Sequence, residues 1–182
     1  MASPQGHTQY SRWSTIDKLT EKEVQVFKKV VVCLDGSGLA EQILPYVTEG
    51  ALRFNTTVVL LQVLDVPTTF AWIEGTAPDA DIVTKESRRE EEAKVYLESV
   101  ATSLRTRGLG VDTVVLHRIA ADEAILDYAD GNDVDVIAIT THGRSGLARA
   151  VLGSVADSVV RKSGLPVLVI NPPDTDTSYT NA

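Results

Sequence analysis

The chain has 182 residues, of which 43% are hydrophobic, and a formal net charge of -8. This length favours one well-buried domain. The negative charge argues against nucleic acid or an anionic membrane surface as a partner, because both are bound through clustered Lys and Arg. The only cysteine, Cys33, lies in an apolar run, so we expect a buried strand residue rather than a nucleophile. A chain without an internal disulfide fits a cytoplasmic location.

The two ends of the chain are polar and differ from the apolar segments between them. The first residues lack the apolar core of a secretory signal, and no apolar run approaches the length that crosses a membrane. We expect residues 1–27 to be a partly disordered extension, residues 28–171 to form the folded domain, and residues 172–182 to be a disordered tail.

Five short segments rich in β-branched residues are almost continuously apolar, which is typical of parallel strands buried on both faces. They are, in chain order, Lys29–Leu34, Thr57–Leu64, Val111–Leu116, Val134–Thr140 and Leu165–Ile170. Helical patterns separate them, at Leu39–Phe54, Ile82–Arg107, Asp122–Asp130 and Val155–Lys162. This alternation predicts right-handed crossovers and an α/β fold with one doubly wound, five-stranded parallel sheet and helices on both faces.

Local chemistry indicates where two of the helices begin or end. Ser154 and Asp157 match the S-x-x-D pattern of a capped helix start, with Ser154 as the cap. Gly164 suits the left-handed turn that ends the same helix. Pro45 removes an amide donor from the first predicted helix, so we expect a kink or a late start there.

The most informative segment follows the fourth predicted strand. The apolar run Val134–Ile139 leads directly into Thr140–Gly146, and Gly153-Ser154 stands where the next helix should begin. Glycines let the backbone approach an anion, and a helix start offers unpaired amide N–H groups and the positive end of its dipole. The segment therefore predicts a phosphate-binding loop. In the alternative interpretation, the glycines only serve a turn and Ser154 only caps the helix.

The carboxyl ends of two other predicted strands also carry residues that could contact a ligand. Asp35–Gly38 comes after the first strand, and Val63–Asp65 ends the second. Ligands of doubly wound sheets bind beyond the carboxyl ends of the strands, where the winding reverses, so these segments and the glycine loop are predicted to converge on one ligand. Asp35 can accept hydrogen bonds from ribose or adenine, or it can cap the turn that follows it. Residues 67–81 are expected to form a loop that borders the site.

Motifs of other phosphate-binding and catalytic classes are missing from the sequence. No G-x-x-x-x-G-K segment is present, and Glu41 stands where a dinucleotide fingerprint starting at Gly36 needs its third glycine. There is no G-x-S-x-G elbow, and the three histidines are scattered. These observations disfavour a P-loop enzyme, a redox enzyme of the Rossmann type, a hydrolase triad and a structural zinc site. The charged run Glu86–Glu92 is interpreted as a solvated helix face.

Four segments of the chain together resemble the universal stress protein family. They are Val30–Ser37, Thr141–Leu147, Leu152–Ala156 and Leu165–Ile170, and the resemblance covers roughly residues 28–171. Nucleotide-binding members carry a glycine, two residues, a second glycine, nine residues, and then glycine followed by Ser or Thr. Gly143 and Gly153-Ser154 match this spacing, whereas Thr140 replaces the leading glycine.

This resemblance implies an adenine nucleotide alpha hydrolase-like fold and a regulatory stress-response protein that binds ATP or AMP. Mg²⁺ is expected alongside a triphosphate, with at most slow ATP hydrolysis. Asp35 matches the aspartate that contacts adenine or ribose, Val63 the residue beside the purine, and Ser154 a phosphate ligand. The implied nucleotide-binding residues are Cys33, Asp35, Val63, Ile139, Thr140, Thr141, His142, Gly143, Arg144, Ser145, Gly153, Ser154 and Val155.

Thr140 puts a β-carbon where the family usually has none. Either the ligand shifts, or the hydroxyl acts as a donor in its place, or binding is lost. The main alternative function is therefore a dimeric signalling or structural module of the same fold that binds no nucleotide, and a nucleotide- or phosphoryl-transfer enzyme is a third. The resemblance also implies a homodimer through Leu165–Ile170, which would cover an exposed edge strand.

Overall fold

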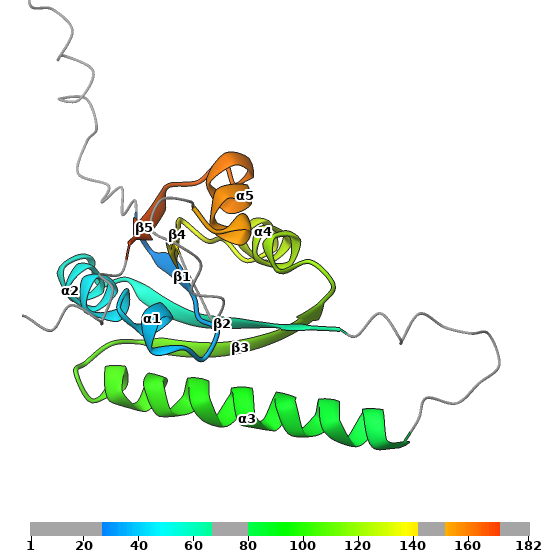
Figure 1. Ribbon diagram of the computed structural model, residues 1–182. Helices are drawn as coiled ribbons and strands as arrows, with labels where there is room; N and C mark the ends of the chain where they lie inside the picture. The colour runs from blue at the N-terminus through cyan, green and yellow to red at the C-terminus, as the bar shows by residue number, and fades with distance from the viewer. Residues whose placement is uncertain (1–26, 67–79, 142–151, 172–182) are drawn as a thin grey trace, which may run out of the picture.

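The computed structural model describes residues 27–66, 80–141 and 152–171. Their strands form one five-stranded sheet in the order β3-β2-β1-β4-β5 (Figure 1), and every neighbouring pair is parallel. The strands are β1 (Lys29–Cys33), β2 (Thr57–Asp65), β3 (Val111–Arg118), β4 (Val136–Thr140) and β5 (Val167–Ile170). The predicted parallel five-stranded α/β fold is confirmed.

Helices cover both faces of this sheet, as predicted. They are α1 (Gly38–Glu41), α2 (Leu44–Phe54), α3 (Ala80–Arg105), α4 (Ala121–Gly131) and α5 (Ser154–Lys162). The first predicted helix is divided in two, and Pro45 lies in the first turn of α2. The amides of a first turn have no partner within the helix, so proline is tolerated there, and the structure shows the late start.

The sheet separates two hydrophobic clusters, because side chains of a strand point alternately to its two faces. Val30 and Val32 of β1 pack with α1, α2 and α3 on one face. Val31, between them in sequence, packs with α4 and α5 on the other face, and all three valines are buried. Near-continuous apolar character along β1 and β2 thus reflects burial on both sides.

Two predicted strands begin later than their apolar runs suggest. Val134 is buried but belongs to the turn before β4, in which Asp133 has a φ of 52°. The carboxylate of Asp135 accepts hydrogen bonds from the amides of Lys28 and Lys29 at 2.8 and 2.9 Å, which fastens this turn to the start of β1. Before β5, Gly164 has a φ of 64°, the left-handed conformation predicted for it. Val134 is therefore apolar because it is buried, and not because it pairs as a strand residue.

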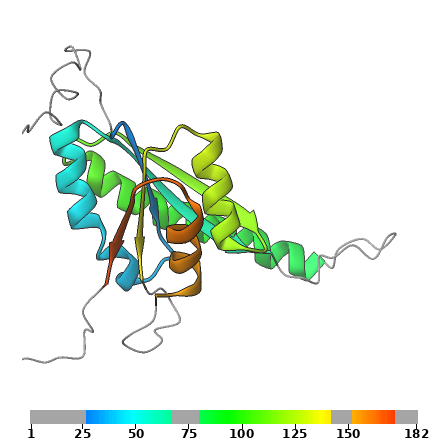
Figure 2. The same ribbon diagram turned by 90° about the horizontal axis from the view of Figure 1, so that it is seen from above.

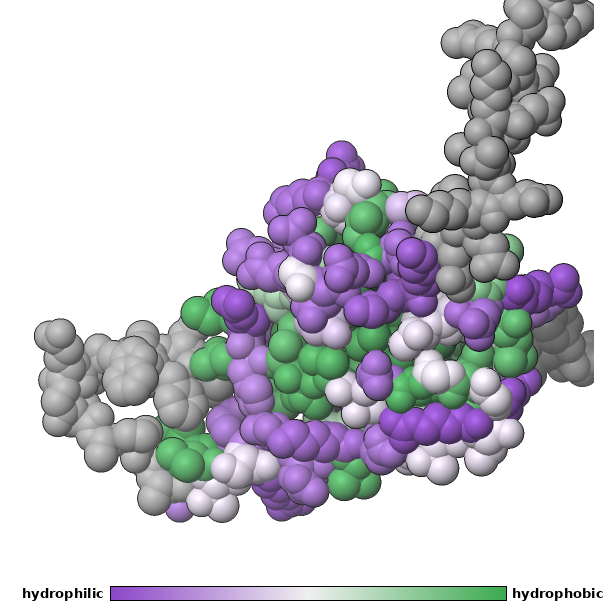
Figure 3. Space-filling model, turned by 180° about the vertical axis from the view of Figure 1, so that it is seen from behind, coloured by the Kyte–Doolittle hydropathy of each residue, from purple (hydrophilic) through white to green (hydrophobic). Residues whose placement is uncertain are grey.

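The surface of the described part of the molecule mixes hydrophobic and hydrophilic residues, as the face in Figure 3 shows. Its exposed large hydrophobic side chains include Tyr46, Leu52 and Phe54 of α2, and the Phe54 ring lies 5.5 Å from that of Phe27 between centroids. Among the described residues, no helix has both the length and the apolar character needed to cross a membrane.

The strand order determines where a ligand can enter. From β1 the chain winds through β2 to β3 at one edge, and it then crosses back to β4 and β5 on the other side of β1. The winding therefore reverses between β1 and β4, whose carboxyl ends are adjacent. In sheets of this type the crevice at that reversal is the usual ligand site.

Candidate functional site at the carboxyl ends of β1 and β4

The end of β4 and the start of α5 are held together through the backbone. The amide of Gly153 donates to the carbonyl oxygen of Thr141 at 2.9 Å, and Figure 2 shows the end of β4 and the start of α5 at the same edge of the sheet. A β-carbon added to Gly153 would lie only 2.6 Å from that oxygen. Glycine is therefore required for this approach of helix to strand.

The helix start differs by one residue from the prediction. Gly153, not Ser154, occupies the cap position of α5, and Ser154 is its first helical residue. The prediction of a Ser154 cap was wrong because the close contact with Thr141 places the extended residue (φ −56°, ψ 150°) at the glycine. Asp157 also does not turn back to the cap, since its carboxylate accepts from Arg161 at 2.9 Å.

A polar contact between helices positions α5. The Ser158 hydroxyl donates to the carboxylate of Asp122, in the first turn of α4, at 2.5 Å, and Lys162 lies 3.5 Å from the same carboxylate. The Ser158 hydrogen bond, with a smaller contribution from the Lys162 charge, lowers the pKa of Asp122. These contacts join α4 to α5 in addition to their apolar packing.

Asp35 follows β1 at the point of reversal. Its Oδ1 accepts from the Ser37 amide at 2.9 Å and from the Ser37 hydroxyl at 2.6 Å, and the Ser37 hydroxyl in turn accepts from the Ala40 amide at 3.1 Å. Gly36, between them, has a φ of 82° and so adopts the left-handed conformation. The turn-capping role considered for Asp35 is thus present, and it fixes the orientation of the carboxylate at the strand end.

Cys33 and Val63 lie on the α4 and α5 side of the sheet. Both are partly buried and pack against the hydrophobic cluster that contains Val31 and Ile139. Removal of the Cys33 thiol from water raises its pKa to about 12, so the reactive thiolate is scarcely populated at neutral pH. This agrees with a packing role for Cys33.

The last residues of β4 are buried. Ile139 and Thr140 are each 6% exposed, and Thr140 stands opposite Ile170 in the register of β4 and β5. Thr141, just beyond, donates from its amide to the Ile170 carbonyl at 2.9 Å. The hydroxyl-bearing side chain at position 140 is therefore part of the packed strand end and not of an open loop.

The structure brings together most of the predicted site that it describes. Asp35 and the pair Thr140-Thr141 end adjacent strands, and Gly153 and Ser154 begin the helix that is bonded to Thr141. Val155, next in α5, is half-buried against the α4 and α5 cluster. The predicted residues His142, Gly143, Arg144 and Ser145 lie outside the described residues, as do 67–79 of the predicted loop, 1–26 of the predicted extension and the predicted tail 172–182.

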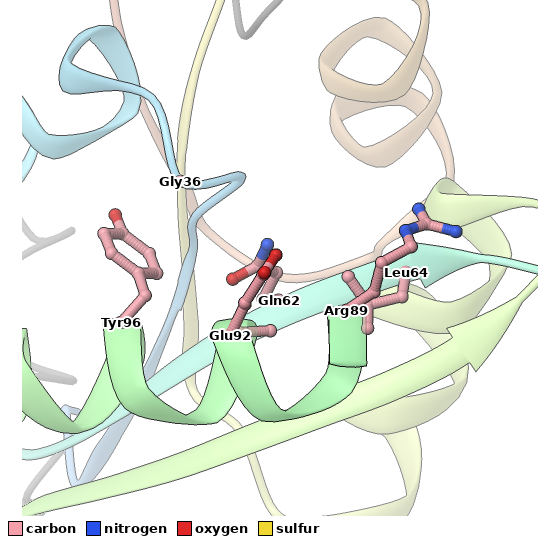
Figure 4. A pocket seen from close by; sticks show the side chains of 7 residues that line it. Gly36, Gln62, Leu64, Arg89, Glu92 and Tyr96 are labelled. Carbon is pink, nitrogen blue, oxygen red and sulfur yellow. The ribbon is translucent and has the colours of Figure 1, made fainter. Parts of the chain in front are cut away.

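A cavity of about 280 Å³ lies beside this site, on the α3 side of the sheet, and the sequence interpretation did not identify it. Gln62 of β2 lines it (Figure 4) and is only 4% exposed. A lone glutamine within the apolar run of β2 was the available signal. Arg89 and Glu92 of the charged run also line the cavity, so that run is only in part the solvated helix face that was predicted. Within the described ranges, no group of three His, Cys, Asp or Glu side chains is arranged to hold a metal ion.

Comparison with known proteins agrees with this architecture. Residues 27–171 match the model of the universal stress protein family. Universal stress protein MJ0531 of Methanocaldococcus jannaschii is 28% identical over 163 residues, which cover 89% of this chain and 92% of that protein. The structure of MJ0577, from the same organism, superposes with a TM-score of 0.69 at 28% identity and covers 82% of this chain and 99% of that one.

A third similar protein was solved with a ligand. The universal stress protein of Archaeoglobus fulgidus in complex with dAMP is 27% identical, covers 80% of this chain and 99% of that chain, and has a TM-score of 0.53. The family model spans most of the chain, and the overall fold is similar to that of the solved relatives. The chain therefore belongs to the universal stress protein family.

Proposed function

We propose that this protein binds an adenine nucleotide, ATP or AMP, at the carboxyl ends of β1 and β4 and acts as a regulatory stress-response module. The observation that carries this proposal is the contact between Gly153 and Thr141. It brings the start of α5 against the end of β4 at the reversal of the winding, which is where sheets of this type bind nucleotides. The Archaeoglobus fulgidus relative in complex with dAMP supports the same ligand class.

The phosphates would lie at the start of α5. The amides of Ser154 and Val155 precede the first hydrogen bond within the helix, which runs from the Asp157 amide to the Gly153 carbonyl at 2.9 Å. Such amides, together with the helix dipole, favour an anion. Ser154 is exposed in the first helical position, so its hydroxyl adds a further donor. Mg²⁺ would accompany a triphosphate as its counter-ion.

The sugar would lie at the end of β1. The Asp35 carboxylate is held there by Ser37, and a carboxylate accepts several hydrogen bonds at once, so a ribose hydroxyl is a suitable donor to it. Thr140 restricts how closely the nucleotide approaches the end of β4, because its side chain is buried in the packed strand. The nucleotide would therefore make its closest contacts on the α5 side.

A homodimer through β5 is part of this proposal. Within the described residues β5 pairs only with β4, so its outer edge presents backbone groups that a second copy can pair with. Its four residues are all partly buried and apolar, and their side chains already pack on both faces of the sheet. Pairing two such edges would extend the sheet and its cores across the dimer.

Amide chemical shifts of nitrogen-15-labelled protein, followed during addition of ATP, test both binding and its location. We expect saturable shifts at Gly153, Ser154 and Val155 and near Asp35, with Ser99 in the second half of α3 as an internal reference. The absence of shifts at millimolar ATP would favour the nucleotide-free signalling module. Saturable shifts confined to α3 would move the binding site away from the strand ends.

A further inference from the structure

The outer side of α2 carries two exposed aromatic rings, and Figure 1 shows this helix at the outside of the described part of the molecule. Tyr46 is 59% exposed and Phe54 is 54% exposed, with Gly50 midway between them in the helix. Residues four positions apart are neighbours on a helix surface, so Tyr46, Gly50 and Phe54 form one aromatic stripe along α2. The buried residues of α2 lie on its other side.

The first described residue lies at one end of this stripe. The ring of Phe27 lies 5.5 Å from that of Phe54 between centroids, at a tilt of 49°. The carbonyl oxygen of Phe27 accepts a hydrogen bond from the Thr56 hydroxyl at 2.7 Å, and that of Lys28 accepts from the Thr57 amide at 2.8 Å. These contacts fix the point at which residues 1–26 join the fold, beside the carboxyl end of α2.

The sequence of residues 1–26 supplies apolar side chains that suit such a stripe. Trp13, Ile16 and Leu19 recur at every third position, a spacing that places side chains on one side of a helix. The segment has three Lys and Arg residues and three Asp and Glu residues, so its side-chain charges balance, whereas the whole chain carries a net charge of -8. The acidic domain therefore does not repel it.

The area of the stripe favours a tethered occupant over a separate molecule. An aromatic side chain buries about 150–250 Å², so two rings that are already partly covered offer far less than the roughly 800 Å² that each partner contributes to a stable interface. A segment joined to the fold at Phe27 needs no such area, because its tether holds it at a local concentration on the order of millimolar.

The tether is also long enough to reach the whole stripe. Tyr46 lies about 12 Å along the helix axis from Phe54, at about 1.5 Å per residue. Trp13 precedes Phe27 by 14 positions, which span about 21 Å even at the short rise of a helix. Trp13 can therefore reach either end of the stripe from the point at which the chain enters the fold.

We propose that residues 13–19 dock on the aromatic stripe of α2 in the same chain, with Trp13, Ile16 and Leu19 packed against Tyr46 and Phe54. The contact is apolar and covers two rings that would otherwise be open to other molecules. It lies away from the strand ends assigned to the nucleotide, so this inference does not depend on the proposed function.

A spin label beside Trp13 tests the contact in the full-length protein. A nitroxide is attached through Ser14→Cys, while the native Cys33 thiol stays largely unmodified because burial raises its pKa to about 12. The nitroxide broadens the amide signals of nearby nitrogen-15-labelled residues. We expect Tyr46 and Gly50 to lose most of their signal intensity until the label is reduced. Ile125 of α4, on the other face of the sheet, should keep its intensity.

Two mixtures distinguish the chain's own segment from that of a second copy. In the first, chains that carry both the isotope and the nitroxide are diluted with excess unmodified chain. In the second, isotope-labelled chains without nitroxide are mixed with excess nitroxide-labelled chain of natural isotope content. The expected result is a loss of the Gly50 signal in the first mixture and not in the second. The reverse result would assign the stripe to a second copy and overturn the proposal.

Two substitutions in the same helix test the role of the stripe itself. Tyr46→Ser removes one ring, so most of the lost Gly50 signal should return. Leu52→Ser is the matched control, because Leu52 is 50% exposed but lies about 160° around the helix from Phe54, and the loss should persist in it. Equal effects of the two substitutions, or no loss at α2 without them, would overturn the proposal. Both side chains are exposed, so neither change removes a core residue.

Discussion

The amide of Gly153 lies 2.9 Å from the carbonyl oxygen of Thr141, and a β-carbon on Gly153 would come within 2.6 Å of the same oxygen. The hydrogen bond and the missing side chain depend on each other, because any larger residue would push α5 away from the end of β4. This one contact sets the position of the helix start to which we assign the phosphates.

Gly153→Ala is therefore expected to destabilise the fold by about 1–3 kcal/mol, since the backbone must shift to admit the methyl group. Urea unfolding measures the change. Gly50→Ala is the matched control, because Gly50 lies inside α2 with nothing within 4 Å of an added β-carbon. The control should gain about 0.5–1 kcal/mol. An equal change in unfolding free energy for the two variants would show that α5 does not approach the end of β4 tightly.

Thr140→Gly tests the one departure from the nucleotide-binding pattern. Loss of a buried side chain from β4 should cost roughly 1–2 kcal/mol in unfolding free energy. The same change removes the β-carbon beside the nucleotide, so ATP binding should tighten by about fivefold, or roughly 1 kcal/mol. Calorimetry on the folded variant measures the affinity. Unchanged or weaker binding would show that Thr140 does not obstruct the site.

Much of the fold is predictable from the sequence, for identifiable reasons. β1 and β2 are buried on both faces, so their continuous apolar runs mark them directly, and Pro45 correctly indicates the late start of α2. The errors lie at the ends of elements. Val134 is apolar because it is buried before β4, although it is not part of the strand. Ser154 was predicted as the helix cap from its local pattern, whereas the cap position is set by the contact of Gly153 with Thr141, which the local pattern does not contain.

The candidate site was predictable only where its residues follow strands. Asp35 and Thr141 lie within two residues of the ends of β1 and β4, so their place at the same edge of the sheet follows from the parallel pairing of these strands. The cavity lined by Gln62 was not predicted, because it depends on the packing of α3 across β2, and that packing leaves no local pattern in the sequence. A polar residue inside an apolar strand is a signal only once its neighbours are known.

Stability at high pH should depend on Cys33. Its folded-state pKa, about 12, is raised above its ordinary value of 9.0, so the unfolded chain loses the thiol proton first as the pH rises. The stabilisation is complete below pH 9 and decreases between pH 9 and 12, by at most about 1.4 kcal/mol per pH unit. Unfolding of wild type and Cys33→Ala across this range isolates the effect. A difference in unfolding free energy between wild type and Cys33→Ala that stays constant from pH 9 to 12 would contradict this prediction.

Val169→Pro tests the proposed dimer edge. The Pro166 and Ile170 carbonyls accept from the amides of Ile137, in β4, and Thr141, just after it, at 3.1 and 2.9 Å. Alternation along the strand then directs the amide of Val169 to the free edge, so proline there removes an outward donor and leaves the β4 pairing intact. Light scattering should show monomer for Val169→Pro and dimer for wild type. A dimer that persists in the variant would place the interface elsewhere.

The most direct test of the central claim is a calorimetric titration of ATP into the wild-type protein after any copurified nucleotide has been removed and identified. The account predicts a saturable heat with one nucleotide bound per chain, and an adenine nucleotide among the released molecules. No released nucleotide and no binding heat at millimolar ATP would contradict the assignment of the β1 and β4 ends as a nucleotide site.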